Sequence, residues 1–294
     1  RVKTNEDYTD VILDENNQYT LVNDEVSISR FGEKTTFEKL QDMIGLDSVK
    51  NEVQEFIAIT NMNKSRKDKG FNTSGVTLHS LFLGNPGTGK TTVARLMGKL
   101  LYENNIISTD KYVETSRSDL VGQHIGHTAI KTRKVLESAL GGVLFIDEAY
   151  TLAKGGERDF GSEAIDEILK FMEDHREDIV LIFAGYTKDM EKFLEMNEGL
   201  RSRIPNVFHF EDYSIEQLYQ IGLNDLVSKG YKVDVEAYQK LLKNNFERSN
   251  DFSNGRWVRN QNEKILRKVA MYLFENNIEI IETIPSEVLE NCYI

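Results

Sequence analysis

The sequence predicts an α/β protein, in which a parallel sheet covered by helices is followed by a smaller helical domain. Three observations support this fold class. Apolar runs alternate with helical patterns up to about residue 210, a glycine-rich loop follows the first run, and only helical patterns remain after Tyr213. Alternating strands and helices are typical of a parallel sheet with helices on its faces. The predicted strands are 78–83, 112–115, 143–147, 179–184 and 207–210.

The N-terminal segment, residues 1–36, is acidic and polar, with two short apolar runs at 11–13 and 19–22. These runs could form a small hairpin or belong to a linker, and we favour an extended arm. A helical pattern begins at Phe37 and continues through Ile57. We therefore expect an N-terminal arm or linker over 1–36 and an α/β domain over 37–210.

The C-terminal segment, residues 211–294, is expected to form the helical domain. Its apolar residues recur with helical spacing in three stretches, at about 214–229, 234–248 and 255–275. No strand pattern interrupts them.

Composition narrows the class of protein. The chain has 294 residues, of which 39% are hydrophobic, and a formal net charge of −12. This acidity argues against duplex DNA as the main partner, because phosphate contacts need clustered Lys and Arg. The single cysteine, Cys292, excludes an internal disulfide framework and fits a reducing compartment. No apolar run is long enough to span a membrane, so we expect a cytoplasmic protein without membrane insertion.

The most specific motif is the stretch 84–91, which fits the pattern G-x-x-x-x-G-K-[ST] of a phosphate-binding loop. Its glycines let backbone N–H groups surround an anion, Lys90 can reach the β- and γ-phosphates of ATP, and the Thr91 hydroxyl can hold Mg²⁺. A glycine-rich turn without a ligand is the alternative, but the flanking strand and helix patterns favour nucleotide binding. The predicted nucleotide contacts in and after this loop are Asn85, Pro86, Gly87, Thr88, Gly89, Lys90, Thr91 and Thr92.

A second motif is the apolar strand 143–146, which ends in Asp147 and Glu148. Asp147 would hold Mg²⁺, and Glu148 would orient the water that attacks the γ-phosphate. A polar pair after a buried strand is common by itself. Together with the phosphate-binding loop, it favours hydrolysis over binding alone.

Two arginines complete the candidate catalytic set. Arg203, with Arg201 in reserve, precedes the last predicted strand and could reach the nucleotide of a neighbouring subunit. Arg256 begins a helix of the C-terminal domain and could point back towards the nucleotide. Solvated surface arginines are the alternative for both positions.

Taken together, these motifs resemble those of the CbxX/CfqX family of AAA+ ATPases over about residues 37–274. The resemblance implies a five-stranded αβα P-loop NTPase domain, a helical lid, bound ATP and Mg²⁺, and a homo-oligomer, with a hexamer as the expected ring. It also implies that Ile44 and Gly45 lie near the adenine, that Arg203 acts in trans and that Arg256 is the lid sensor. The segments that carry it are 84–91, 120–129, 145–150, 183–186, 200–203 and 256–260.

The resemblance implies an ATPase ring that remodels or partly threads a protein partner. The alternative is a nucleotide-gated assembly or docking module of a sporulation or secretion complex, without threading. A third interpretation, a motor acting on DNA, is disfavoured by the acidic charge.

Two positions depart from the family pattern. The fourth predicted strand has no Asn to sense the γ-phosphate, so Tyr186 or Thr187 must serve. The loop expected to face the ring pore has His124 where an aromatic residue is usual, followed by Ile125. Histidine offers less apolar surface for gripping a chain.

Two further interpretations concern this region. The glycine-rich loop 154–161 could line the pore beside His124, although a plain surface loop is the alternative. A metal site at His124 and His127 is disfavoured, because so few ligands are present.

Overall fold

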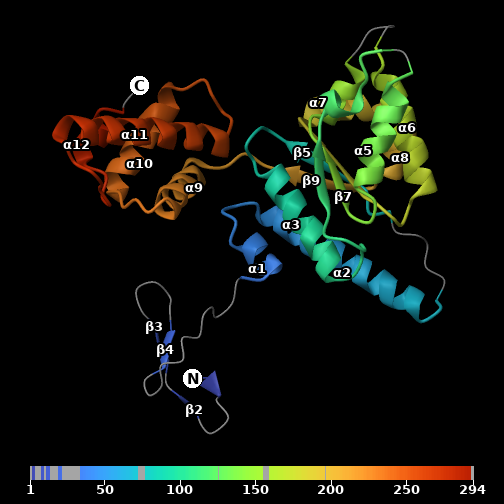
Figure 1. Ribbon diagram of the computed structural model, residues 1–294, viewed down its shortest axis with the longest axis horizontal. Helices are drawn as coiled ribbons and strands as arrows, with labels where there is room; N and C mark the ends of the chain where they lie inside the picture. Colours follow the sequence, from blue (N-terminus) through green and yellow to red (C-terminus); the bar gives the residue numbers. More distant parts are fainter. Residues whose placement is uncertain are drawn as a thin grey trace. The chain divides into compact units, whose positions relative to one another are not determined.

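The computed structural model describes residues 34–71, 77–124, 126–154, 159–195 and 197–292, together with the backbone of four short strands nearer the N-terminus. The chain divides into two compact units, Arg1–Asp42 and Met43–Ile294 (Figure 1). Each unit is described by itself below. The second unit contains the five-stranded sheet, its covering helices and the C-terminal helices.

In the first unit, the residues that the structure describes form two short antiparallel ladders and one helix. Strand β1 (Val2–Lys3) pairs with β2 (Tyr8–Thr9), and β3 (Val11–Leu13) pairs with β4 (Tyr19–Leu21). The extended arm that we favour is therefore wrong for residues 11–13 and 19–21, because these two apolar runs pair with each other as the hairpin alternative expects. Helix α1 (Thr36–Gln41) begins with a capping box between Thr35 and Glu38.

The helical pattern that starts at Phe37 forms two helices rather than one. After α1, helix α2 (Asp47–Asp68) begins only at Asp47. Gly45 and Leu46 between them have positive φ angles of 63° and 59°. A right-handed helix cannot continue through left-handed residues, so the periodicity alone overestimated the helix length.

The sheet of the second unit has five parallel strands in the order β6-β7-β8-β5-β9. This confirms the predicted fold class and all five predicted strands. Strands β7 and β8 are buried along their whole length, as expected for a sheet covered on both faces. The strands are β5 (Ser80–Gly84), β6 (Tyr112–Thr115), β7 (Val143–Ile146), β8 (Val180–Gly185) and β9 (Asn206–Phe210).

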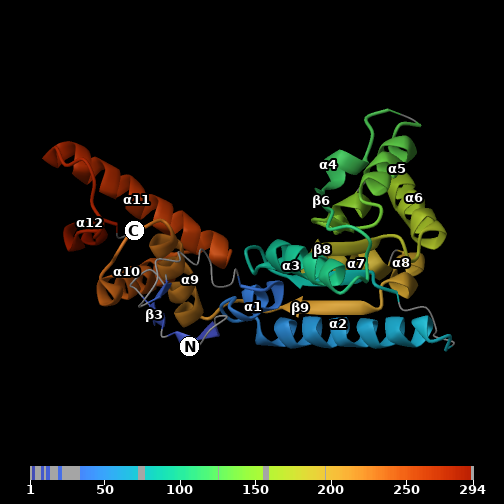
Figure 2. The same cartoon turned by 60° about the horizontal axis from the view of Figure 1, so that its bottom comes forward.

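Helices cover both faces of this sheet (Figures 1 and 2). Helices α2 and α3 (Lys90–Glu103) cover one face, where Phe56 of α2 meets Phe208 of β9 edge to face. The other face carries the helices that connect the later strands, as right-handed crossovers require. These are α5 (Thr128–Ser138), α6 (Gly161–Asp174), α7 (Thr187–Glu195) and α8 (Glu198–Arg203), with the short α4 (Arg117–Leu120) and the 3₁₀ turn η1 (Ala149–Ala153) beside them.

The C-terminal helices form a second hydrophobic core. Trp257 and Tyr238 are among the largest fully buried side chains of the unit, and they pack with the leucines of the neighbouring helices. A capping box between Ser214 and Gln217 starts the first helix after the sheet. The helices are α9 (Ile215–Ser228), α10 (Val235–Arg248), α11 (Gly255–Asn276) and α12 (Ser286–Glu290).

Candidate active site

The phosphate-binding loop connects the end of β5 at Gly84 to the start of α3 at Lys90. Gly87 and Gly89 have φ angles of 71° and 99°, which side chains other than glycine rarely adopt. Thr88 is fully buried and its hydroxyl donates to the Asn85 carbonyl at 2.9 Å. The loop therefore has the tight turn that a phosphate-binding loop needs, at the carboxyl end of a central strand.

The side chain of Lys90 is held in place by hydrogen bonds to the phosphate-binding loop. Its ammonium donates to the carbonyl of Gly84 at 2.8 Å and to that of Asn85 at 2.7 Å. Burial, the largest cause, lowers the pKa of Lys90 to about 8; the nearby carboxylate of Asp147 opposes this shift and the charge of Arg256 adds to it. A bound phosphate group would supply the negative charge that this buried ammonium lacks.

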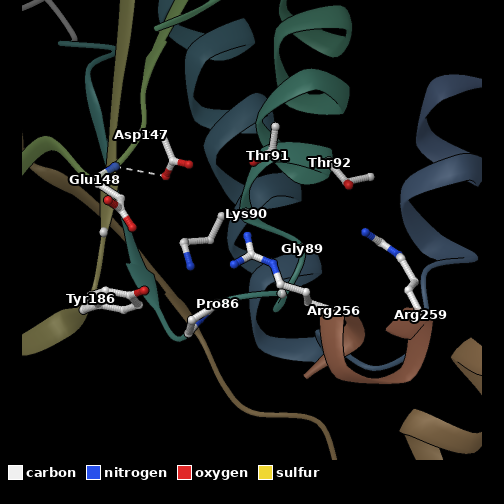
Figure 3. A pocket seen from close by; sticks show the side chains of 12 residues that line it. Pro86, Gly89, Lys90, Thr91, Thr92, Asp147, Glu148, Tyr186, Arg256 and Arg259 are labelled. Atoms are coloured by element: carbon white, nitrogen blue, oxygen red, sulfur yellow. Dashed lines mark hydrogen bonds between the residues drawn. The ribbon is translucent and has the colours of Figure 1, made fainter. Parts of the chain in front are cut away.

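Asp147 and Glu148 follow β7 and face the same pocket as Lys90 (Figure 3). The Asp147 N–H donates to the carbonyl of Thr115 on the neighbouring strand at 2.9 Å, which continues the sheet pairing by one residue. Glu148 has left-handed backbone angles, φ 46° and ψ 44°, and its N–H donates to Oδ1 of Asp147 at 3.0 Å. The turn thus directs two successive carboxylates into the pocket.

The residues present fit a Mg²⁺ ion at this point. Thr91 and Asp147 both line the pocket and offer a hydroxyl and a carboxylate oxygen, the donors that Mg²⁺ takes together with water and phosphate oxygens. Within the described ranges, no group of three or more His, Cys, Asp and Glu side chains could hold a metal ion.

Two arginines of α11 close the pocket on the side opposite the carboxylates. The guanidinium of Arg256 points towards Lys90 and Gly89, and Arg259 lies one helical turn further on (Figure 3). Sequence reasoning singled out Arg256 but missed Arg259. Its position three residues after Arg256 on one helix could have revealed it, because residues at this spacing share a face.

The two candidate sensors of the γ-phosphate differ in position. Tyr186, which follows β8, lines the pocket together with Lys90 and Glu148. Thr187 begins α7 and is not among the lining residues. Tyr186 is thus the one of the two that borders the pocket, and its role as the sensor stays a prediction.

The segment that contains Ile44 and Gly45 lies next to the phosphate-binding loop. A Cβ atom placed on Gly89 would come within 3.4 Å of side-chain atoms of both Met43 and Leu46. A Cβ atom on Gly45 would come within 2.7 Å of Gln217 on α9. Ile44 and Gly45 do not line the phosphate pocket itself, so their predicted role near the adenine stays a prediction.

Arg203 lies far from this pocket. It ends α8, just before the amino end of β9, and lines a separate cleft with Thr77 and His79, which precede β5. Since the sheet is parallel, this cleft is at the edge opposite the phosphate-binding loop. The Arg203 guanidinium lies 3.3 Å from a carboxylate oxygen of Glu173 and donates to the Gly199 carbonyl at 3.1 Å. Arg201 is exposed.

His79, in the same cleft, is a buried histidine that the sequence analysis did not single out. It is 2% exposed, and its Nδ1 accepts from the Leu181 N–H at 3.1 Å. Burial lowers its pKa to about 4, so the ring is neutral at neutral pH. Its hydrogen bond connects the residue just before β5 to β8, and it does not line the phosphate pocket.

The expected pore-facing loop is described only in part. His124 is exposed, and its ring meets that of His127 edge to face with centroids 5.4 Å apart. Ile125, and residues 155–158 of the glycine-rich loop that could line the pore, lie outside the described residues. The role of His124 in the pore therefore stays a prediction.

Comparison with known proteins identifies the family of this chain. The sequence profile of the ATPase family associated with various cellular activities (AAA) matches residues 80–212, and that of the AAA lid domain matches residues 214–287. Stage V sporulation protein K of Bacillus subtilis is 45% identical over 240 residues, which cover 80% of this chain and 74% of that protein. The chloroplastic ribulose bisphosphate carboxylase/oxygenase activase of Cyanidioschyzon merolae is 43% identical over 237 residues, which cover 80% and 81%.

Solved structures share the fold at lower identity. The RuvB Holliday junction branch migration motor of Thermotoga maritima has a TM-score of 0.58 and 19% identity, covering 86% of this chain and 70% of that chain. At this identity the likeness concerns the fold alone. In the part of this chain that the structure describes, no helix has the length and apolar character to cross a membrane.

Proposed function

The chain belongs to the CbxX/CfqX family of AAA ATPases, and from this premise we propose that it forms an ATP-driven ring that remodels a protein partner. ATP hydrolysis is the general activity of this family. The observation that carries the ring is the separation of the catalytic groups. Lys90, Asp147, Glu148 and Arg256 share one pocket, whereas Arg203 lies at the opposite edge of the sheet. An arginine in that position is suited to complete the pocket of a second copy.

In the proposed reaction, the backbone N–H groups of Asn85 and of residues 87–92, together with the ammonium of Lys90, bind the phosphates of ATP. Glu148 accepts a hydrogen bond from the attacking water and orients it towards the γ-phosphate. Mg²⁺, held by Thr91 and Asp147, would neutralise charge on the β- and γ-phosphates. Arg256 and the neighbour's Arg203 would stabilise the charge that develops on the transferred group.

The moving parts in this proposal are the αβα domain over 37–210 and the lid over 211–294, with residues 1–36 as an arm or linker. Arg256 and Arg259 support this division, because the lid contributes both to a pocket otherwise built by the αβα domain. A change in the phosphates would therefore change the contacts of the lid. We propose a hexamer as the ring, in keeping with the family.

Mixing experiments test the ring. The rate of ATP hydrolysis per subunit should rise with protein concentration, and adding inactive Arg203→Ala subunits should lower the rate of the native subunits. Glu148→Gln serves as the comparison, because it should bind ATP but fail to hydrolyse it in its own subunit. A rate per subunit that neither depends on concentration nor responds to Arg203→Ala would contradict shared active sites.

A second experiment separates remodelling from the alternative, a nucleotide-gated docking module. A Glu148→Gln variant that carries a photo-crosslinking residue at position 124 would be mixed with labelled casein, which serves as an unfolded probe. Threading predicts crosslinks that need ATP. Absence of crosslinks, together with full hydrolysis by His124→Ala, would favour gating without threading. The exposure of His124 supports its use as the probe position.

A further inference from the structure

The carbonyl groups of the phosphate-binding loop accept hydrogen bonds from two parts of the lid, the start of α11 and the residues just before α9. The Pro86 carbonyl accepts from the side-chain amide of Asn254 at 3.3 Å, and the Gly87 carbonyl accepts from the Gly255 N–H at 3.1 Å. The Thr88 carbonyl accepts from the hydroxyl of Tyr213 at 3.1 Å. Three consecutive loop residues are therefore fixed from outside the loop.

Asn254 is at the centre of this network. It is 4% exposed, and its amide nitrogen also donates to Oδ1 of Asp212 at 2.8 Å, while its Oδ1 accepts from the Tyr213 N–H at 2.9 Å. The same Asp212 carboxylate accepts from the side chain of Asn85 at 3.0 and 2.9 Å. Asn254 thus connects the phosphate-binding loop, the residues just before α9 and the start of α11.

The backbone of Asn254 adopts a conformation that favours glycine. Its angles are φ 54° and ψ −128°, and the Arg256 N–H donates to the Ser253 carbonyl at 3.0 Å. These values are those of the second residue of a type II′ turn, a position where glycine is preferred. Asparagine here costs backbone strain, so the hydrogen bonds of its side chain offset a conformational penalty.

We propose that Asn254 is a positioning residue, which holds the first turn of α11 against the phosphate-binding loop so that Arg256 meets the nucleotide phosphates. Arg256 is two residues further on and enters the pocket directly from this turn. The inference rests on the proposed role of Arg256. It concerns hydrolysis alone and does not depend on what the ring acts upon.

Asn254→Gly tests the proposal cleanly, because glycine suits the turn and only the amide is lost. We expect kcat for ATP hydrolysis to fall roughly 10–100-fold, the usual cost of a misplaced catalytic group. Asn254→Asp should lose activity as well, since it removes the donor and sets a second carboxylate beside Asp212. Asn262→Ala is the matched control. Asn262 is fully buried on the same helix, and its side chain forms hydrogen bonds with groups of α9 and α10 within the lid.

The decisive comparison is a double-mutant cycle with Arg256→Ala. If Asn254 acts through Arg256, Asn254→Gly should lower kcat little further once Arg256 is gone. The Asn262→Ala control should lower the melting temperature, followed by the fluorescence of Trp257, while changing kcat by less than roughly threefold.

Multiplicative losses in the cycle, or equal losses of kcat in Asn254→Gly and the control, would overturn the inference. An unchanged kcat in Arg256→Ala alone would remove the proposed role of that arginine as well. The two failures are therefore distinguishable.

Discussion

The guanidinium of Arg203 is paired with the carboxylate of Glu173, 3.3 Å away, at the edge of the sheet opposite the phosphate-binding loop. Both side chains are well exposed, so the pair should contribute little to folding. Arg203→Ala is therefore expected to keep the native melting temperature but to lower kcat by roughly a thousandfold or more, the usual effect of losing a trans-acting arginine.

Arg203→Lys is the sharper variant at this position. It keeps the charge but loses the planar fork of donors, so activity should stay low. Thermal melting and steady-state hydrolysis, measured for both variants at the same subunit concentration, provide the test. Normal activity in either variant would show that the guanidinium does not stabilise the transferred phosphoryl group.

Nucleotide binding should take up a proton at mildly alkaline pH. The pKa of Lys90 is lowered to about 8 by burial, so the free site has lost much of its charge at about pH 8.5. Bound phosphates favour the ammonium and raise that pKa, so affinity for ADP should weaken as the pH rises through about 8. Calorimetry of ADP binding in two buffers of different ionisation enthalpy measures the proton. Equal heats in both buffers at about pH 8.5 would argue against a lowered pKa.

Gly87→Ala should prevent the lid from docking on the loop. A Cβ atom there would lie 2.2 Å from the Ser253 carbonyl oxygen, at a φ of 71° that disfavours alanine. We expect the variant to lose nucleotide binding. We also expect its free energy of unfolding to fall by more than the cost of the backbone strain alone. Gly230→Ala is the matched control, because Gly230 has a φ of 84° and a Cβ atom added there would face open space among the described residues. It should cost about 1 kcal/mol in unfolding free energy and leave binding of labelled ADP intact.

His79 should make the fold sensitive to acid. The folded pKa is about 4 against an ordinary 6.5, so the unfolded chain binds more protons between these values. The free energy of unfolding should therefore have its full value above about pH 6.5 and fall by up to ~3 kcal/mol as the pH drops towards 4. His79→Asn keeps an acceptor for the Leu181 N–H but does not titrate. Urea unfolding at several pH values should show a flatter pH dependence for this variant, and identical profiles would contradict the prediction.

The sheet was predictable because its strands are largely apolar runs between polar loops. Strand β6 has the predicted bounds, 112–115, whereas β5 begins two residues later than predicted, at Ser80. Leu78 is buried there without being paired in the sheet, and apolarity reports burial rather than hydrogen bonding. The short helix α12 was missed, because its five residues are too few for a period to be recognised.

The core of the candidate site was predictable from motifs, since Lys90, Asp147 and Glu148 follow strands whose carboxyl ends meet at one edge. The network around Asn254 was not. Asn85 and Asp212 are 127 positions apart in the sequence, and no local pattern marks their contact. Such contacts depend on how the lid packs against the loop, which periodicity cannot specify.

The length of α11 gives the contact at its start a mechanical consequence. The helix runs for 22 residues, or about 33 Å, from the turn at the phosphate-binding loop to its far end. Because the helix is long, a small rotation about the hydrogen-bonded turn at its start moves its far end by a larger distance. A tilt of about 10° at Gly255 would carry the exposed side chain of Phe274 through roughly 5 Å. An ångström-scale adjustment at a phosphate could thus become a displacement as large as a side chain at the outer surface of the lid.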